Sequence, residues 1–243
     1  MRTLIIPCAG KSTRFTTKIP KWLLTHPSGK TMVYESIQGL PLDTFDKIII
    51  VALKRHLTEK FTVRIFKEFS KYNFSLVTLD NDTKSASDTI SQCVESLDIK
   101  GSIFIKDSDD YFKVDKVEPN EICTYSLNDC KNITPGNKSY IKMNEHGEVL
   151  TIVEKNVISA DFCCGLYSFE DAKEFVKTYK SIQQESEIYV SHVIFQMLLN
   201  GNRFYNRNTK DYIDWGTQKD WDIFLKNNIY INTNDINGTS NTI

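Results

Sequence analysis

Four short apolar segments in the first half of the chain alternate with longer amphipathic ones, and this alternation constrains the fold most. The apolar segments, predicted to be strands, are residues 3–7, 47–53, 74–79 and 102–106. The amphipathic segments, predicted to be helices, are residues 32–40, 57–72 and 87–97, the last capped by Ser85 or Ser87. Strands separated by helices pair in parallel, because a parallel pair requires a long crossover connection. The sequence therefore predicts an α/β fold with three layers and a mostly parallel central sheet.

The second half of the chain contains shorter, more closely spaced strands. They are predicted at residues 121–127, 139–144, 148–154 and 162–169, with a Glu-His-Gly hairpin signal at 145–147. We expect residues 121–169 to form a small mixed-strand subdomain. Helices are predicted at 170–179, 188–199 and 218–225, and the Asn- and Thr-rich residues 227–243 are expected to be a loose tail. No repeat or long linker divides the chain, so residues 1–243 are predicted to form one domain.

Charge and hydropathy exclude several classes of protein. Lys and Arg number 30 against 31 Asp and Glu, a balance that argues against a nucleic-acid-binding protein. No apolar run approaches the ~20 residues of a membrane span, and the apolar stretch near the N-terminus is too short for a signal peptide. The six cysteines form no C-x-x-C pair, so we expect reduced thiols. Together these features predict a cytoplasmic protein without membrane or nucleic-acid partners.

The loop after the first predicted strand contains a fragment of a phosphate-binding motif. Residues 10–13, Gly-Lys-Ser-Thr, match the end of a Walker A loop. That motif also requires a glycine five residues before Gly10, where this chain has Ile5. The sequence therefore does not favour a P-loop.

Residues 7–24 fit another pattern better. In it, a strand is followed by A-A-G-x-G-T-R and an apolar residue, and six residues later by the lysine of a P-K pair. The matching residues are Ala9, Gly10, Thr13, Arg14, Phe15, Pro20 and Lys21. This segment resembles the signature of the nucleotidyltransferases that make sugar nucleotides and related activated metabolites. The resemblance implies the Rossmann-like fold of that family.

The resemblance also implies roles for individual residues at the nucleotide. The backbone of the loop would bind the nucleotide, through Pro7, Cys8, Ala9, Gly10, Lys11, Ser12 and Thr13. Arg14 and Lys21 would be the catalytic residues that face the triphosphate. Ser12 replaces the second glycine of the signature, which restricts the loop backbone. Ser85, Ala86 and Ser87 occupy the place of the segment that contacts the nucleobase in the family, although a plain helix cap explains these residues as well.

Two aspartates match the family's magnesium ligands. The fourth predicted strand runs into Asp107-Ser108-Asp109-Asp110, where Asp109 takes the place of the first ligand. Asp214 begins Asp-Trp-Gly-Thr, which is similar to the family's D-x-G-T and supplies the second. Carboxylates suit Mg²⁺, a hard cation that also binds phosphate oxygens and water. The resemblance therefore implies Mg²⁺ as the cofactor.

A third set of residues is implied to bind the acceptor. Val153-Glu154-Lys155 is similar to the V-E-K motif of the family, whose lysine contacts the acceptor phosphate. Gly165 begins a segment like the strand that floors the acceptor pocket. Cys163 replaces an asparagine that contacts the sugar in sugar-specific relatives, and Tyr140 replaces a glycine, so we expect both to line an acceptor pocket unsuited to a hexose 1-phosphate.

These resemblances imply transfer of a nucleoside monophosphate from a nucleoside triphosphate to a small phosphorylated acceptor, with release of pyrophosphate. The compact length is similar to that of the cytidylyltransferases of capsule gene clusters, which favours CTP and makes phosphoglutamine a candidate acceptor. Three alternatives remain open. One is a sugar-1-phosphate nucleotidylyltransferase that uses UTP or dTTP. The others are a metal-dependent glycosyltransferase, whose D-x-D would be residues 107–109, and a non-catalytic nucleotide-binding regulator.

Overall fold

The computed structural model describes residues 1–10, 14–130, 133–184 and 186–237. Four parallel strands form one side of the main sheet in the order β4-β1-β2-β3, with β3 at the edge. Their bounds are β1 Arg2–Cys8, β2 Lys47–Leu53, β3 Phe74–Leu79 and β4 Ser102–Lys106. The three later strands match their predicted bounds, because each is a buried or half-buried run of β-branched and aromatic residues.

Beyond β4 the sheet becomes mixed. β9 (Asp161–Phe169) pairs antiparallel with both β4 and β6 (Glu121–Ser126), and β10 (Tyr205–Asn208) lies at the edge, parallel to β6. β7 (Ser139–Met143) and β8 (Val149–Glu154) form the predicted hairpin, which joins the sheet through β9. A separate two-stranded sheet pairs β5 (Asp110–Lys113) with β11 (Lys210–Asp214). The sequence did not predict β5, β10 or β11, which are short and largely polar.

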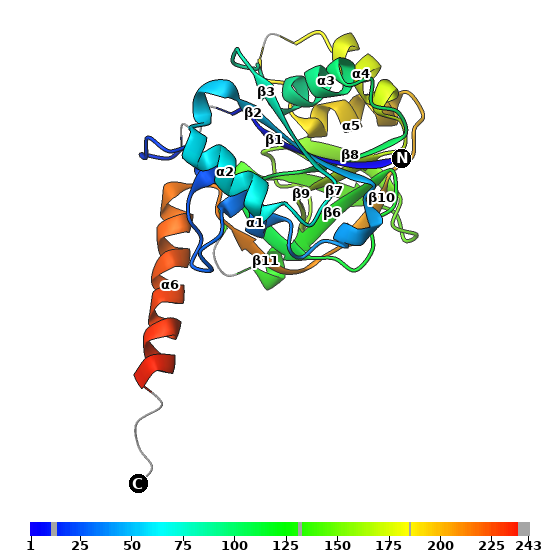
Figure 1. Cartoon of the computed structure of the whole chain (residues 1–243). Coiled ribbons are helices and arrows are strands. Elements are labelled where there is room, and N and C mark those ends of the chain that lie inside the picture. The colour runs from blue at the N-terminus through cyan, green and yellow to red at the C-terminus, as the bar shows by residue number, and fades with distance from the viewer. Residues whose placement is uncertain (11–13, 131–132, 185, 238–243) are drawn as a thin grey trace.

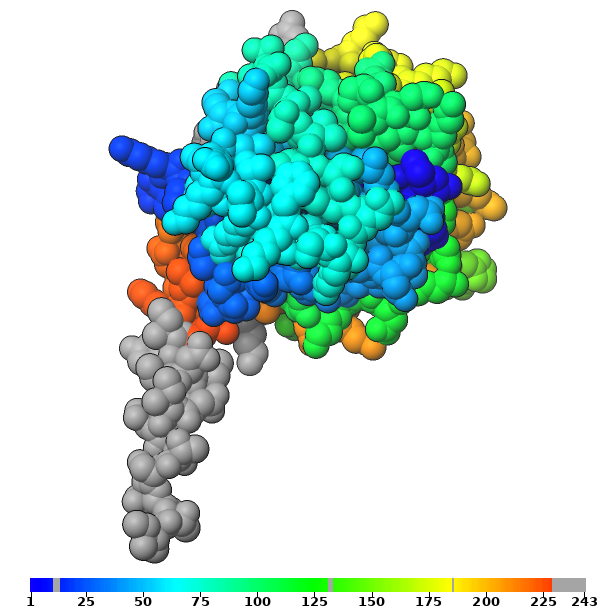
Figure 2. Space-filling view, viewed as in Figure 1, coloured from blue at the N-terminus to red at the C-terminus, as the bar shows by residue number. Residues whose placement is uncertain are grey.

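Helices cover both faces of the sheet (Figure 1). One face carries α3 (Ala86–Ser96), α4 (Ala172–Ser181) and α5 (Val190–Leu199), and the other carries α1 (Met32–Ser36) and α2 (Glu59–Glu68). In the space-filling view, residues around α2, in cyan, cover the front of the molecule (Figure 2). Short 3-10 helices are Lys21–Leu23, Leu42–Thr44, Lys54–His56, Leu127–Asp129 and Pro135–Asn137. The predicted three-layer α/β architecture is confirmed.

Alternation along the strands separates two hydrophobic cores. Ile5, Ile49 and Ile105 contribute to the core beneath α3, α4 and α5. Their strand neighbours Leu4, Ile50 and Phe104 point the other way, into the core beneath α1 and α2. Side chains of a strand alternate between faces, so strands apolar at every position need cover on both sides.

The last helix differs from its prediction. α6 runs from Gln218 to Asn237, well past the expected end at residue 225. Its second half is rich in Asn, a weak helix former, so composition favoured a tail there. Within the described part of the chain, no helix combines the length and the apolar character needed to cross a membrane. All six cysteines are free thiols, and five are buried.

Candidate active site

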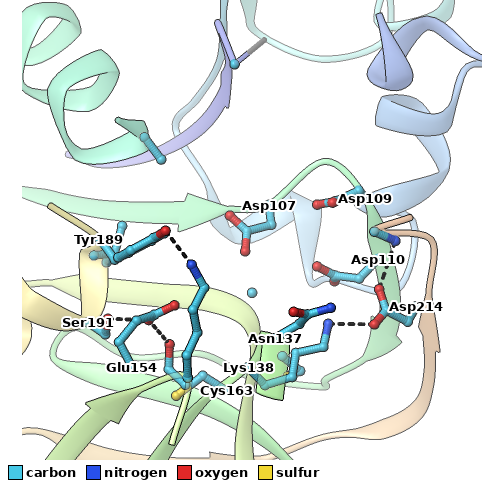
Figure 3. Close-up of a pocket in the computed structure, with 18 of the residues that line it drawn as sticks. Asp107, Asp109, Asp110, Asn137, Lys138, Glu154, Cys163, Tyr189, Ser191 and Asp214 are labelled. Carbon is cyan, nitrogen blue, oxygen red and sulfur yellow. Dashed lines mark hydrogen bonds and ion pairs between the residues drawn. The ribbon is translucent and has the colours of Figure 1, made fainter. Parts of the chain in front are cut away.

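A cavity of about 490 Å³ lies where β1 and β4 end (Figure 3). Parallel sheets commonly bind ligands at the carboxyl ends of their strands, where loops from several elements meet. Here the loops after β1, β4, β8 and β11 contribute, together with the start of α5. The residues used below that line the cavity are Gly10, Arg14, Lys21, Ala86, Asp107, Asp109, Asp110, Lys138, Ser139, Glu154, Lys155, Cys163, Gly165, Tyr189, Ser191, Asp214 and Gly216.

Two cations lie beside Asp109. Lys21 Nζ is 2.5 Å from Asp109 Oδ2, and Arg14 Nη2 is 3.7 Å from the same oxygen. Burial alone would raise the pKa of Asp109, but Lys21 and Arg14 outweigh burial and hold that pKa well below its usual value. Asp109 is therefore an ionised carboxylate, and it lines the cavity together with its two positively charged neighbours.

The pairing of β11 with β5 brings Asp214 to Asp109. Asp214 lies opposite Asp110 in this pairing, and the Trp215 amide donates a hydrogen bond to the Asp109 carbonyl at 2.8 Å. Gly216 lies between the two carboxylates. A Cβ at Gly216 would lie 2.9 Å from Asp214 Oδ1 and 3.4 Å from Asp109 Oδ2, so both side chains face the same small space. Because residue 216 is glycine, no side chain fills this space between the two carboxylates.

The facing carboxylates of Asp109 and Asp214 fit Mg²⁺, which prefers oxygen ligands and fills its other positions with phosphate and water. Lys138 pairs with Asp214, with Nζ 2.7 Å from Oδ2. Burial lowers the pKa of Lys138, but Asp214 outweighs burial and raises it above the usual value. In the described residues, no group of three or more His, Cys, Asp and Glu side chains is placed to hold a metal ion. A bound ion would therefore depend on these two carboxylates and on ligands from the substrates.

A buried lysine supports the loop that carries Asp109. Lys106 at the end of β4 is inaccessible to solvent, and its ammonium donates to the Asp107 carbonyl at 2.8 Å and to Asp110 Oδ1 at 2.5 Å. Burial raises the pKa of Asp110 to about 8 although Lys106 opposes the shift, and burial followed by Asp109 raises the pKa of Asp107 to about 6. Gly165 packs against this loop with φ +88°, where a Cβ would overlap Asp110 Oδ2.

The other end of the cavity is formed by β8 and the start of α5. The Glu154 carboxylate accepts hydrogen bonds from the hydroxyls of Ser139 and Ser191, the second at 2.6 Å. Lys155 follows Glu154 in a left-handed backbone conformation with φ +55°. Its ammonium contacts the Tyr189 hydroxyl and lies 4.1 Å from the centre of the Tyr189 ring. This end therefore presents an exposed cation beside a carboxylate held by two serines.

The fold of the chain has counterparts among solved structures, although no protein-family model and no curated protein matches the sequence. A nucleoside-diphosphate-sugar pyrophosphorylase from Vibrio cholerae RC9 matches with a TM-score of 0.75 and 18% identity, over 92% of this chain and 99% of that chain. The inositol-1-phosphate CTP transferase from T. maritima matches with a TM-score of 0.73 and 14% identity, over 93% of this chain and 94% of that chain. A UDP-glucose pyrophosphorylase complexed with UDP-glucose matches with a TM-score of 0.72 and 14% identity, over 96% of this chain and 99% of that chain. The chain has the nucleotidyltransferase fold.

Within this nucleotidyltransferase fold, ten of the residues given a binding or catalytic role from the family resemblance line the cavity: Gly10, Arg14, Lys21, Ala86, Asp109, Glu154, Lys155, Cys163, Gly165 and Asp214. Lys11, Ser12 and Thr13 lie outside the described residues. Pro7, Cys8 and Ala9 lie at the end of β1 and in the residue after it, where Cys8 and Ala9 are buried. Ser85 caps α3 by accepting from the Asp88 amide, and Ser87 is buried in that helix, so neither side chain lines the cavity.

Tyr140 is not in the cavity, contrary to the sequence expectation. It is fully buried in the core beneath α1 and α2, where its hydroxyl donates to the Pro135 carbonyl at 2.8 Å. Ser139, its neighbour on β7, lines the cavity instead. Adjacent strand residues point to opposite faces, so Ser139 in the cavity places Tyr140 on the other face.

No pattern in the sequence indicates a role for Lys138. It follows a Pro-Gly-Asn turn and precedes β7, so it looked like an ordinary polar residue at a strand end. Asp107 was singled out only as part of a D-x-D, and Lys106 only as the end of a strand. Tyr189 and Ser191 looked like residues of an amphipathic helix. Only the tertiary arrangement shows that all of these lie at or beneath the cavity.

Proposed function

We propose that the protein is a Mg²⁺-dependent nucleotidyltransferase that transfers a nucleoside monophosphate to a small phosphorylated acceptor. The observation that carries this proposal is the arrangement of charge in one cavity. Arg14 and Lys21 lie beside Asp109, Asp214 faces Asp109, and Lys155 lies at the other end. Cations at both ends suit two phosphorylated substrates that meet at the paired carboxylates.

In this proposal, the nucleoside triphosphate lies beside Gly10, where Arg14 and Lys21 neutralise the triphosphate. Lys155 holds the acceptor phosphate. An oxygen of that phosphate attacks the α-phosphorus in line, a new P–O bond forms, and the bond to the β-phosphate oxygen breaks as pyrophosphate leaves. The attacking phosphate is already an anion, so no general base is required. Mg²⁺ held by Asp109 and Asp214 would supply charge neutralisation at the phosphates.

We propose CTP as the nucleotide and phosphoglutamine as the candidate acceptor, in the synthesis of capsule or surface-polysaccharide precursors. Cys163 lines the cavity and offers no amide to a sugar hydroxyl, which disfavours a hexose 1-phosphate. A protein of the same fold is described as an inositol-1-phosphate CTP transferase, so the fold accommodates this nucleotide. With Tyr140 in the core, the argument about the acceptor rests on Cys163.

A pyrophosphate-release screen tests the proposal. The four common nucleoside triphosphates would each be incubated with Mg²⁺ and a panel of acceptors that includes phosphoglutamine, inositol 1-phosphate and glucose 1-phosphate. We expect the highest kcat/KM for CTP with a non-hexose acceptor. Efficient use of glucose 1-phosphate with UTP or dTTP would identify a sugar-1-phosphate nucleotidylyltransferase. Sugar transfer from a nucleotide sugar without pyrophosphate release would identify a glycosyltransferase, and nucleotide binding without either reaction a regulator.

Replacing Lys155 by alanine is expected to raise the KM for the acceptor about tenfold, with little change in the KM for CTP. The ammonium is exposed at the acceptor end, where it contacts Tyr189, so its loss removes a phosphate contact without disturbing the core. Steady-state kinetics with each substrate varied in turn measures both values. Lys142→Ala, an exposed lysine on β7, is the control. Equal increases in the two KM values would contradict the assignment.

A further inference from the structure

Lys138 places a charged side chain deep in the cavity, and none of the roles above uses it. It follows the 3-10 helix Pro135–Asn137, and its side chain is 16% exposed. Its ammonium donates to Asp214 Oδ2 at 2.7 Å and to the Tyr212 hydroxyl at 2.6 Å. An ammonium has three protons to donate. Since Lys138 lines the cavity, a third hydrogen bond can go to a ligand there.

The backbone of Lys138 connects the two ends of the cavity. Its carbonyl accepts a hydrogen bond from the Lys155 amide at 3.0 Å, and the next residue, Ser139, donates to Glu154. The main chain of Lys138 is thus fixed at the acceptor end, while its side chain reaches Asp214 (Figure 3). The ammonium therefore lies between the lysine assigned to the acceptor phosphate and the paired carboxylates.

The proposed reaction needs positive charge at this place. An acceptor phosphate and the α-phosphate are both anions, and they must approach to bonding distance among the carboxylates of Asp107, Asp109 and Asp214. Lys21 and Arg14 lie beside Asp109, and Lys106 is buried behind the loop and bonded to it. Fixed charges aimed at the point where phosphate groups meet lower the barrier most effectively in a partly buried site.

We propose that Lys138 is a catalytic residue that donates a hydrogen bond to the reacting phosphates while it stays anchored by Tyr212. This inference rests on the proposed nucleotidyl transfer and adds to it a residue that binds the phosphates in the transition state. It also assigns Lys138 a second effect: its positive charge competes with a metal cation for Asp214. Loss of the ammonium therefore weakens catalysis and strengthens cation binding at the same time.

Lys138→Met and Lys138→Arg in the full-length protein test the catalytic part. Methionine keeps much of the length without the charge, and we expect kcat for pyrophosphate release to fall about 100-fold. Arginine retains the charge, so kcat of Lys138→Arg is expected to be at least about tenfold higher than kcat of Lys138→Met. The control is Lys113→Met on β5, which removes an exposed ion pair to Asp211 at 2.8 Å on the same pair of strands. Thermal unfolding confirms that the variants compared are folded.

Binding of Mn²⁺ to the protein without substrates gives a readout independent of turnover. Electron paramagnetic resonance of free Mn²⁺ is expected to show about tenfold tighter binding to Lys138→Met than to the wild type, because one positive charge near Asp214 is gone. Lys138→Arg and Lys113→Met should bind like the wild type. A role in folding alone would not tighten metal binding.

The outcomes separate this inference from the proposed function. If the wild type releases pyrophosphate and Lys138→Met does so within threefold of the same rate, Lys138 is not catalytic. Unchanged Mn²⁺ affinity in a folded Lys138→Met would also overturn the inference, because the ammonium would then not compete at Asp214. If the wild type itself releases no pyrophosphate with any nucleotide and acceptor, the proposed function fails, and the catalytic role of Lys138 fails with it.

Discussion

Replacing Asp109 by asparagine is expected to lower kcat for nucleotidyl transfer about 1000-fold in a folded protein. The amide has almost the same shape, so the Trp215 amide can still donate to the main-chain carbonyl of residue 109. What disappears is the negative charge. Lys21 and Arg14 lose the carboxylate that holds them 2.5 and 3.7 Å away, and the proposed metal site loses one of its two carboxylates.

Pyrophosphate release at saturating CTP and acceptor, over a series of Mg²⁺ concentrations, measures the effect. The control is Asp211→Asn, which removes an exposed carboxylate on β11, the strand that also carries Asp214. Chelation by EDTA is expected to abolish wild-type activity, and added Mg²⁺ to restore it. Full activity in excess EDTA, or an Asp109→Asn variant within threefold of the wild type, would show that the two carboxylates do not hold a catalytic cation.

The sequence was most informative where burial leaves a periodic pattern. β2, β3 and β4 could be predicted residue by residue. β2 and the middle of β4 are buried apolar runs, as in strands covered on both sides, whereas β3 is a half-buried edge strand in which four of six residues are apolar. β5, β10 and β11 have no such pattern. They are only four or five residues long and contain many polar residues, and β5 and β11 pair with each other outside the main sheet. A single sequence does not indicate such a pairing, although in this chain it brings Asp214 to Asp109.

The residues of the site can also be divided into those that a sequence pattern indicates and those that it does not. Arg14, Lys21, Asp109, Lys155 and Asp214 could be predicted because they occur in motifs with fixed spacing, and all five line the cavity. The prediction for Tyr140 failed because it depended on an alignment, and an error of one residue in a strand moves a side chain to the opposite face. Ser139 lines the cavity in its place.

The lysines that the sequence did not single out form interactions that only the tertiary structure reveals. Lys138 pairs with a carboxylate 76 positions later in the chain, at Asp214, a separation that no local pattern encodes. Lys106 pairs with Asp110 only four positions later, but across the turn between β4 and β5 and not along a helix. A lysine at the end of an apolar strand normally reaches solvent with its ammonium. Here the turn between β4 and β5 places the Asp110 carboxylate next to the buried ammonium of Lys106.

Replacing Lys106 by methionine is expected to reduce the free energy of unfolding by about 3–5 kcal/mol at high pH and by much less at low pH. Methionine fills much of the space of the buried side chain, but it leaves Asp110, which is almost fully buried, without its cation. The Asp107 carbonyl also loses its hydrogen bond from the ammonium. Breaking one side of a buried ion pair is costly because the remaining charge has neither partner nor water.

The pH dependence follows from the pKa of Asp110. Burial raises the folded-state pKa from 3.8 to about 8 although Lys106 opposes the shift, so removing Lys106 raises the pKa further. Above about pH 4 the unfolded chain has released this proton, and the folded variant retains it until the raised pKa is reached. The folded state then binds more protons than the unfolded state, so the stability of the variant falls as the pH rises. Wild-type Asp110 also retains its proton until about pH 8, so the difference between the variant and the wild type should grow mainly above pH 8.

Urea unfolding at several pH values from 5 to 10 measures this difference, with Lys113→Met as the matched control. Lys113 lies on β5 and pairs with Asp211, but both side chains are more than half exposed, so its loss should leave the stability almost unchanged at every pH. A double variant, Lys106→Met with Asp110→Asn, should recover most of the stability at pH 9, because no buried charge remains to be neutralised. If the single variant loses the same stability at pH 5 and pH 10, lost packing and not the charge of Asp110 accounts for the effect of Lys106.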